Sequence, residues 1–191
     1  MRFSDGTAMR LYRQTIEDFG LYPDLEMTQQ EFENLSAAAG AMSAKMRAVL
    51  IVAASSVSKR DLQQRLIRKG EDPRDAKGAV QWMENMQLLD DRKTAEQIVR
   101  HCINKGYGLA RAKQALYEKQ IPKQYWQEVL EDYPDQTDAI YSFLNDRLNG
   151  VVDKRDIKRA VDALMRRGHS YSQVRRALDM LSLETDELPE D

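Results

Sequence analysis

The sequence predicts a mostly α-helical protein built from three tandem three-helix repeats, and two observations lead to this prediction. First, one pattern recurs, in which an apolar residue, a charged cluster, a break and a second amphipathic run begin at Leu66, Leu116 and Leu164. Second, charged residues make up 31% of the 191-residue chain and aromatic residues only 7%. Such a composition is typical of helices with solvated outer faces, and stacked repeats of this kind form an elongated, curved array.

The first repeat is predicted to span residues 44–88. Its first helix places these residues on one apolar face: Met46, Val49, Leu50 and Ala53. Ser58 caps a second helix, which Gly70 ends because glycine adopts the left-handed conformation without a Cβ clash. Asp72 and Pro73 begin the third helix, whose inner face carries Ala76, Val80 and Met83.

The second repeat, 89–133, and the third, 134–182, follow the same order. Asp90 or Asp91 caps the first helix of the second repeat, and Gly106 ends it. The second helices of the first and third repeats are both followed by glycine, at Gly70 and Gly168, whereas Gln120 stands at the matching position of the second repeat. Isolated helices of about 11–16 residues are only marginally stable in water, so we expect neighbouring repeats to share their buried surface.

Residues 1–43 are predicted to form an N-terminal extension. Asp5-Gly6 lies between short alternating runs and predicts a small β-hairpin. A short helix is expected to stop at Gly20, and Thr28 with Glu31 forms the capping box of a further helix, which Gly40 is expected to break. Residues 183–191, with five acidic residues and no basic one, are predicted to be a disordered acidic tail.

These blocks resemble the RecX family, bacterial regulators of the recombinase RecA. The strongest marker is LLDDRKTAEQIVRHCINKGYGLARAKQAL, residues 88–116, where Leu-Asp-Asp precedes a helix, a Lys-Gly turn and an Arg-containing helix. VSKRDLQQRLIRKG, residues 57–70, resembles the preceding block of the family, and FSDG resembles the extension of longer members. Thr94 departs from the pattern, because an aromatic residue, usually Phe, precedes the alanine in this family.

The resemblance implies a non-enzymatic regulator that acts in homologous recombination, DNA repair and the SOS response. It would bind RecA, as the free monomer or as the filament on single-stranded DNA, and inhibit its recombinase, ATPase and coprotease activities. A helical array would lie in the filament groove, with weak nonspecific contact to DNA. No cofactor is implied, and we expect a cytoplasmic monomer.

The basic residues cluster in the three predicted repeats. Residues 46–83 hold 8 basic and 4 acidic side chains, residues 92–119 hold 7 and 2, and residues 150–181 hold 8 and 4. Patches of like sign predict binding to a polyanion or to an acidic protein groove, whereas the alternative is that they merely solvate exposed helix faces. The candidate partner-binding residues are Arg60, Lys69, Arg111, Lys113, Arg159, Arg166, Arg167 and Arg175.

Two other interpretations stay open. A nonspecific nucleic-acid-binding repeat protein would bind DNA alone at physiological salt, through phosphates rather than base edges. A scaffold for an unrelated protein would bind neither DNA nor RecA.

An enzyme is the least favoured interpretation. The chain has two histidines and one cysteine, too few to assemble a nucleophile, a base and an orienting group. His101 and Cys102 point about 100° apart on a helix, so we expect Cys102 in the core and His169 in a solvated turn. Trp82 and Trp126 are also predicted to be core residues. We find no signal peptide and no apolar run approaching about 18 residues, so no membrane contact is expected.

Overall fold

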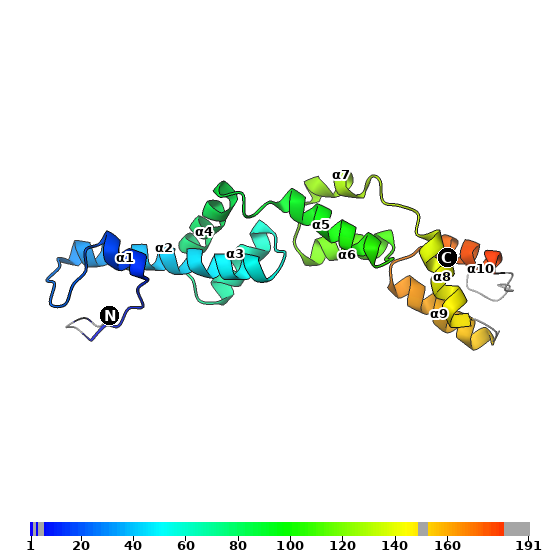
Figure 1. Cartoon of the computed structure of the whole chain (residues 1–191), viewed down its shortest axis with the longest axis horizontal. Helices are drawn as coiled ribbons and strands as arrows, with labels where there is room; N and C mark the ends of the chain where they lie inside the picture. The colour runs from blue at the N-terminus through cyan, green and yellow to red at the C-terminus, as the bar shows by residue number, and fades with distance from the viewer. Residues whose placement is uncertain (2, 4–5, 149–152, 182–191) are drawn as a thin grey trace. The chain divides into compact units, whose positions relative to one another are not determined.

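The computed structural model describes residues 1, 3, 6–148 and 153–181. They divide into two compact units, Met1–Asp90 (unit 1) and Asp91–Asp191 (unit 2). Both units consist of α-helices joined by loops (Figure 1), and no strand is assigned within the described ranges. The prediction of a mostly α-helical protein is confirmed.

The described residues of unit 1 contain four helices, and the starts of the last three follow the predicted capping signals. They are α1 (Arg13–Asp18), α2 (Gln29–Ala54), α3 (Lys59–Arg68) and α4 (Pro73–Asn85). The capping box of α2 is present, since the Glu31 amide donates to Thr28 Oγ1 at 3.3 Å and the Thr28 amide donates to the Glu31 carboxylate at 2.7 Å. Ser58 caps α3 and Asp72 caps α4, as predicted.

Helix α2 runs straight through Gly40, so the prediction of a break there is wrong. A Cβ atom at this position would lie 2.4 Å from Oδ2 of Asp75 in α4. The contact shows that α4 lies close to α2 at Gly40, but the Asp75 carboxylate is the end of a flexible side chain and can rotate away, so it does not by itself require glycine. The packing of α2 outweighs the roughly 1 kcal/mol by which glycine disfavours a helix interior relative to alanine.

Most of the predicted apolar face of α2 is also wrong in register, although Val49 packs against the core. Leu50 is 70% exposed and Met46 39% exposed, whereas Ala44, Ala48 and Ile51 are buried. The stretch AVLIVAA is apolar on most sides, so its periodicity alone does not identify the buried face. The face that carries small alanines is the one that the other helices approach.

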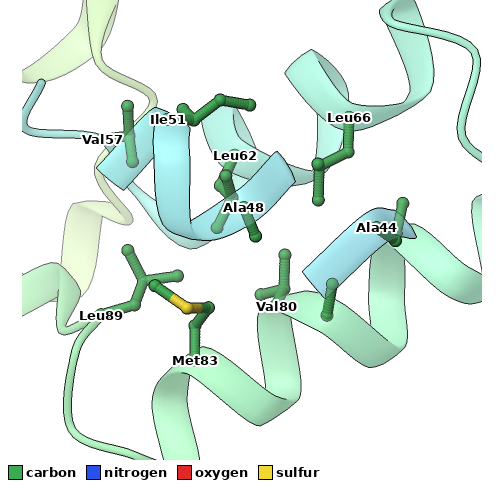
Figure 2. Packing of buried hydrophobic residues seen from close by; sticks show 11 residues of the cluster. Ala44, Ala48, Ile51, Val57, Leu62, Leu66, Val80, Met83 and Leu89 are labelled. Atoms are coloured by element: carbon green, nitrogen blue, oxygen red, sulfur yellow. The ribbon is translucent and has the colours of Figure 1, made fainter. Parts of the chain in front are cut away.

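The core of unit 1 forms where α2, α3 and α4 meet (Figure 2). In this view Ala48 of α2 lies between the side chains of α3 and Met83 of α4. The buried cluster consists of Ala44, Ala48, Ile51, Val57, Leu62, Leu66, Ala76, Ala79, Val80, Met83 and Leu89. Ala76, Val80 and Met83 are thus buried as predicted, and Trp82 is partly buried against the same cluster.

A buried carboxylate connects α2 to the loop between α3 and α4. Glu71 accepts a hydrogen bond from Ser43 Oγ at 3.0 Å and pairs with Arg47 Nε at 2.9 Å. Arg47 also donates to the backbone oxygen of Lys69. Because Glu71 is buried and has these two partners from α2, its charge is compensated within the unit.

Unit 2 holds the helices of the second and third repeats. They are α5 (Asp91–Asn104), α6 (Leu109–Glu118), the 3₁₀ helix η1 (Lys123–Tyr125), α7 (Trp126–Leu130), α8 (Thr137–Leu148), α9 (Lys154–Arg166) and α10 (Tyr171–Met180). Two buried clusters lie here, a small one centred on Leu116 and a larger one that includes Leu164. Each repeat thus has a cluster of its own. Trp126 is only partly buried, packed against the smaller cluster.

A left-handed residue follows the second helix of every repeat. The φ angles are +91° at Gly70, +54° at Gln120 and +86° at Gly168. The matched positions therefore share one conformation although the middle residue is not glycine. A non-glycine residue pays about 1–2 kcal/mol for it, so the backbone at Gln120 is held by its surroundings, including the hydrogen bond from the Ile121 amide to the Leu116 oxygen at 3.0 Å.

The β-hairpin predicted near the N-terminus is not shown. Backbone hydrogen bonds join Met9 to Met1 at 3.0 Å and Phe3 to Thr7 at 2.9 Å, but the described residues here form no strand. The Phe3 ring packs edge-on against Phe32 of α2, with centroids 4.9 Å apart. Asp5 of the predicted turn, like the predicted acidic tail 183–191, lies outside the described residues.

Helix α2 is long and apolar enough to cross a membrane by length and composition. The expectation that no apolar run approaches this length is therefore wrong. Residues of α2 nevertheless form part of the unit 1 core, and a core helix of a water-soluble protein meets the same criterion.

The unit 1 core predicts a contrast between two leucine truncations. L62A should lower the free energy of unfolding by about 2–5 kcal/mol, because Leu62 is fully buried. L50A, at an exposed position of α2, should change it by less than about 0.5 kcal/mol. Urea denaturation followed by circular dichroism measures both, and equal effects would contradict the buried face assigned to α2.

Candidate functional site

Two backbone segments of unit 2 are in direct contact, and the candidate site is built on them. One segment is the α5–α6 turn with the start of α6, residues 106–110, and the other directly follows α9, residues 167–169. The Gly108 amide donates to the Arg167 oxygen at 3.0 Å, and the Ala110 amide donates to the Gly168 oxygen at 3.2 Å. We call this contact the 108/168 junction.

Both glycines are required by the closeness of this junction. A Cβ atom on Gly108 would lie 1.9 Å from the Gly168 oxygen, and one on Gly168 would lie 2.2 Å from the Arg111 nitrogen. These are backbone atoms, so no side-chain rotation relieves the overlap. The sequence indicated a Lys-Gly turn within residues 88–116, and the structure adds that the residues after α9 pack directly against this turn.

His169 is buried in the junction, so the prediction of a solvated turn residue is wrong. Its side chain is 3% exposed, and Nε2 lies 3.0 Å from the Gly106 oxygen. Since a carbonyl only accepts, Nε2 carries the proton, and Nδ1 has no hydrogen-bond partner among the described residues. Burial lowers the pKa of His169, the bond to Gly106 opposes that shift, and the positive charge of Arg167 adds to it.

Tyr133 also contacts the α5–α6 turn. Its hydroxyl donates to the Tyr107 oxygen at 2.6 Å, and burial raises the pKa of Tyr133 to about 12. Cys102 is 2% exposed, and burial raises the pKa of its thiol as well. Cys102 is thus a core residue, as predicted, and is poorly suited to act as a nucleophile.

A shallow groove of about 310 Å³ lies over the 108/168 junction. It is lined by Tyr107, Arg111, Ala163, Arg166 and Arg167. Arg111 comes from α6, and the two other arginines come from the end of α9 and the residue after it. We call this feature the basic groove. It brings together three of the eight predicted partner-binding residues.

The positive charge of the basic groove is only partly compensated. Arg111 pairs with Glu118 at 3.2 Å, an exposed contact. The Arg167 guanidinium lies over the Phe143 ring at 4.5 Å, which orients it without neutralising it. Arg166 makes no ion pair with any residue that the structure describes. The arrangement is suited to binding an anionic group.

The other five predicted residues do not join this groove. Lys113 lines a separate groove of about 330 Å³ with Leu109, Trp126, Gln127, Leu130 and Glu131. Arg159 pairs with Asp156 at 3.2 Å, and Arg175 is exposed on α10. Arg60 and Lys69 are exposed in unit 1.

The sequence interpretation missed the residues that build the groove around these arginines. Tyr107, Phe143 and His169 were not predicted to support it. The available signal was the pair of glycines at 106 and 108 together with Gly168, but each indicates only a local turn. No group of three or more metal-ligating side chains occurs among residues 1, 3, 6–148 and 153–181.

The junction predicts that replacing two glycines of similar backbone conformation by alanine lowers the free energy of unfolding by different amounts. Gly70 and Gly168 both have positive φ, but a Cβ on Gly70 meets nothing within 4 Å. G70A should therefore cost about 1–2 kcal/mol from backbone strain alone. G168A should cost about 2–4 kcal/mol, because the new methyl group overlaps the α6 backbone. Chemical denaturation measures both, and equal costs would refute the close contact.

Buried His169 predicts a pH dependence of stability. Because its pKa in the folded state is below the ordinary value of 6.5, the unfolded state binds more protons as the pH falls below about 6.5. Stability should be full above that pH and should decline as the pH falls toward the folded-state pKa. H169Q should flatten this decline in denaturation curves between pH 5 and 8, whereas H101Q, at an exposed position, should retain it. An identical decline in H169Q would contradict the buried neutral imidazole.

Comparison with known proteins identifies the family. Residues 90–130 match the model of the second three-helix domain of RecX. The chain is 32% identical over 144 residues to the regulatory protein RecX of Halorhodospira halophila, covering 73% of this chain and 89% of that protein. It is 29% identical over 140 residues to the regulatory protein RecX of Vibrio vulnificus, covering 72% and 92% of the two chains.

Solved structures share the fold. A crystal structure of a regulatory protein RecX has a TM-score of 0.67 at 18% identity and covers 93% of this chain and 91% of its own. The crystal structure of RecX from Lactobacillus salivarius has a TM-score of 0.62 at 16% identity and covers 76% and 98%. The matched second domain coincides with α5, α6, η1 and α7, and its α5–α6 turn forms one side of the 108/168 junction. The chain belongs to the RecX family of regulatory proteins.

Proposed function

We propose that this protein binds RecA, as the filament on single-stranded DNA or as the free monomer, and inhibits its recombinase, ATPase and coprotease activities. The observation that carries the proposal is the convergence of Arg111, Arg166 and Arg167 in one groove of a RecX-family chain. RecA would present acidic side chains to this groove. The protein would act by occupying a surface, without chemistry of its own.

The groove is suited to recognising carboxylates. A guanidinium offers a planar fork of donors that matches a carboxylate, and such charge-assisted bonds are stronger than neutral ones. The 108/168 junction holds α6 and α9 together through backbone hydrogen bonds. The backbone that carries the three arginines is therefore preorganised, so less conformational entropy is lost when a partner binds.

Contacts outside the groove would add to the affinity. The five candidate residues outside the groove are distributed over all three predicted repeats, and a helical polymer presents a repeating surface. Several weak contacts on one chain reinforce each other through effective concentration. Arg60, Lys69, Lys113, Arg159 and Arg175 stay predictions for such contacts.

The nonspecific nucleic-acid alternative draws on the same groove, since phosphate also fits three guanidiniums. It predicts that the protein binds DNA alone, with an affinity that falls steeply with salt. The RecA proposal predicts that tight binding requires RecA. Measuring both binding reactions at physiological salt separates the two functions. As a RecA regulator the protein would work in the cytoplasm, in homologous recombination, DNA repair and the SOS response.

The proposal predicts that charge reversal in the groove disables regulation. R166E/R167E should weaken binding to RecA filaments by about 10- to 100-fold, because it places like charge against an acidic partner. The same variant should lose the suppression of single-stranded-DNA-dependent ATP hydrolysis by RecA at substoichiometric protein. The measurements are filament co-sedimentation and a coupled ATPase assay.

A matched control makes the same change in charge outside the groove. R100E/K158E alters two exposed basic residues of unit 2 that do not line it, and should bind filaments like the unaltered protein. Loss of binding in both variants would indicate a general charge effect instead of a site. Undiminished binding of R166E/R167E would remove the basic groove from the interface, and no effect of the unaltered protein on RecA would overturn the proposed function.

A further inference from the structure

We propose that the acidic segment 183–191 of this chain binds in the basic groove of its own unit 2 and competes there with the partner. The intramolecular contact is independent of the proposed function. Its regulatory consequence rests on that function, because competition matters only if the groove binds RecA.

The charges of the two parts are complementary. The segment has no basic residue and five acidic ones, namely Glu184, Asp186, Glu187, Glu190 and Asp191. The groove has three arginines opposed by one carboxylate, that of Glu118. That carboxylate also accepts a hydrogen bond from Gln114 at 3.1 Å. Added carboxylates would therefore meet guanidinium donors that are still available, above all Arg166.

The segment is long enough to reach the groove. Helix α10 starts at Tyr171, two residues after His169 of the junction, and ends at Met180. Ten helical residues span about 15 Å. Six extended residues from Leu181 cover about 20 Å, so Asp186 and Glu187 can return to the level of Arg166 and Arg167.

Other grooves of the described chain are poorer receptors for carboxylates. The groove at Lys113 is lined by three apolar side chains, and the single positive charge of Lys113 is offset there by Glu131. The groove between α2 and α4 has two basic lining residues, Lys45 and Arg74, but also Asp75, whose pKa is raised by burial and by the nearby Asp72 and Glu71. A carboxylate there would meet further negative charge. The basic groove thus has the most favourable field for the acidic segment.

The expected contact is weak enough to be displaced. Exposed ion pairs contribute about 0–1 kcal/mol each, but a short tether supplies an effective concentration on the order of 1 mM. The segment would then occupy the groove part of the time at low salt and yield to a partner that makes more contacts. The segment would thus compete with the partner for the groove and lower the partner's apparent affinity.

Paramagnetic relaxation tests the intramolecular contact without RecA. A nitroxide attached at L188C would report on the segment, and the buried native Cys102 should not react with the label. We expect broadening of the amide signals of Arg111 and of residues 166–169 at low salt. The broadening should vanish near 0.5 M salt, where the Debye length is only about 4–5 Å. It should also vanish in R166E/R167E and persist in R100E/K158E.

Absence of broadening at low salt, or broadening that survives R166E/R167E, overturns the contact. Competition is tested with E184Q/D186N/E187Q/E190Q/D191N, which should bind RecA filaments about 2- to 10-fold more tightly than the unaltered protein. Equal affinity would overturn the competition even where the broadening is observed. If neither protein binds RecA, the proposed function and the competition both fail, whereas the broadening still decides the intramolecular contact.

Discussion

The candidate site depends on the contact between two backbone segments at Gly108 and Gly168. Backbone can approach backbone this closely only where neither residue carries a Cβ, and both glycines are needed for that reason. The contact sets the spacing of α6 and α9, and so the spacing of Arg111 from Arg166 and Arg167. His169, neutral and buried, completes the contact through Gly106. The three arginines of the basic groove are thus positioned by the uncharged, closely packed 108/168 junction beneath them.

This construction presents charged hydrogen-bond donors at the surface. Beneath the groove, burial raises the pKa values of Tyr133 and Cys102 and lowers that of His169. The groups that face solvent are guanidiniums, which stay charged and donate hydrogen bonds. A surface of this kind can hold an anionic partner or an anionic segment of its own chain. The choice between them depends on effective concentration and salt.

The repeats share a backbone pattern more strictly than they share residues. Each second helix ends at a left-handed residue, even where Gln120 replaces glycine. The second repeat also has the smallest buried cluster and a short last helix. Leu116 is nevertheless as buried as Leu66 and Leu164 at the matched positions. The three repeats therefore share a buried leucine in the second helix and a left-handed residue at the end of that helix. The other residues of their buried clusters differ.

Much of the local structure was determined by the sequence alone. Capping residues such as Thr28, Ser58 and Asp72, and stops such as Gly70, act on the adjacent turn, so short-range pattern predicts them correctly. The family resemblance and the candidate arginines could likewise be found from order, spacing and charge. Only the tertiary structure decided which face of α2 is buried, that α2 continues through Gly40, and that Arg111 meets Arg166 and Arg167. The tertiary structure also showed that His169 is buried in the 108/168 junction. These features depend on residues about 30–60 positions away in the chain, as in the pairs Gly40–Asp75 and Gly106–His169, and local periodicity contains no information about such contacts.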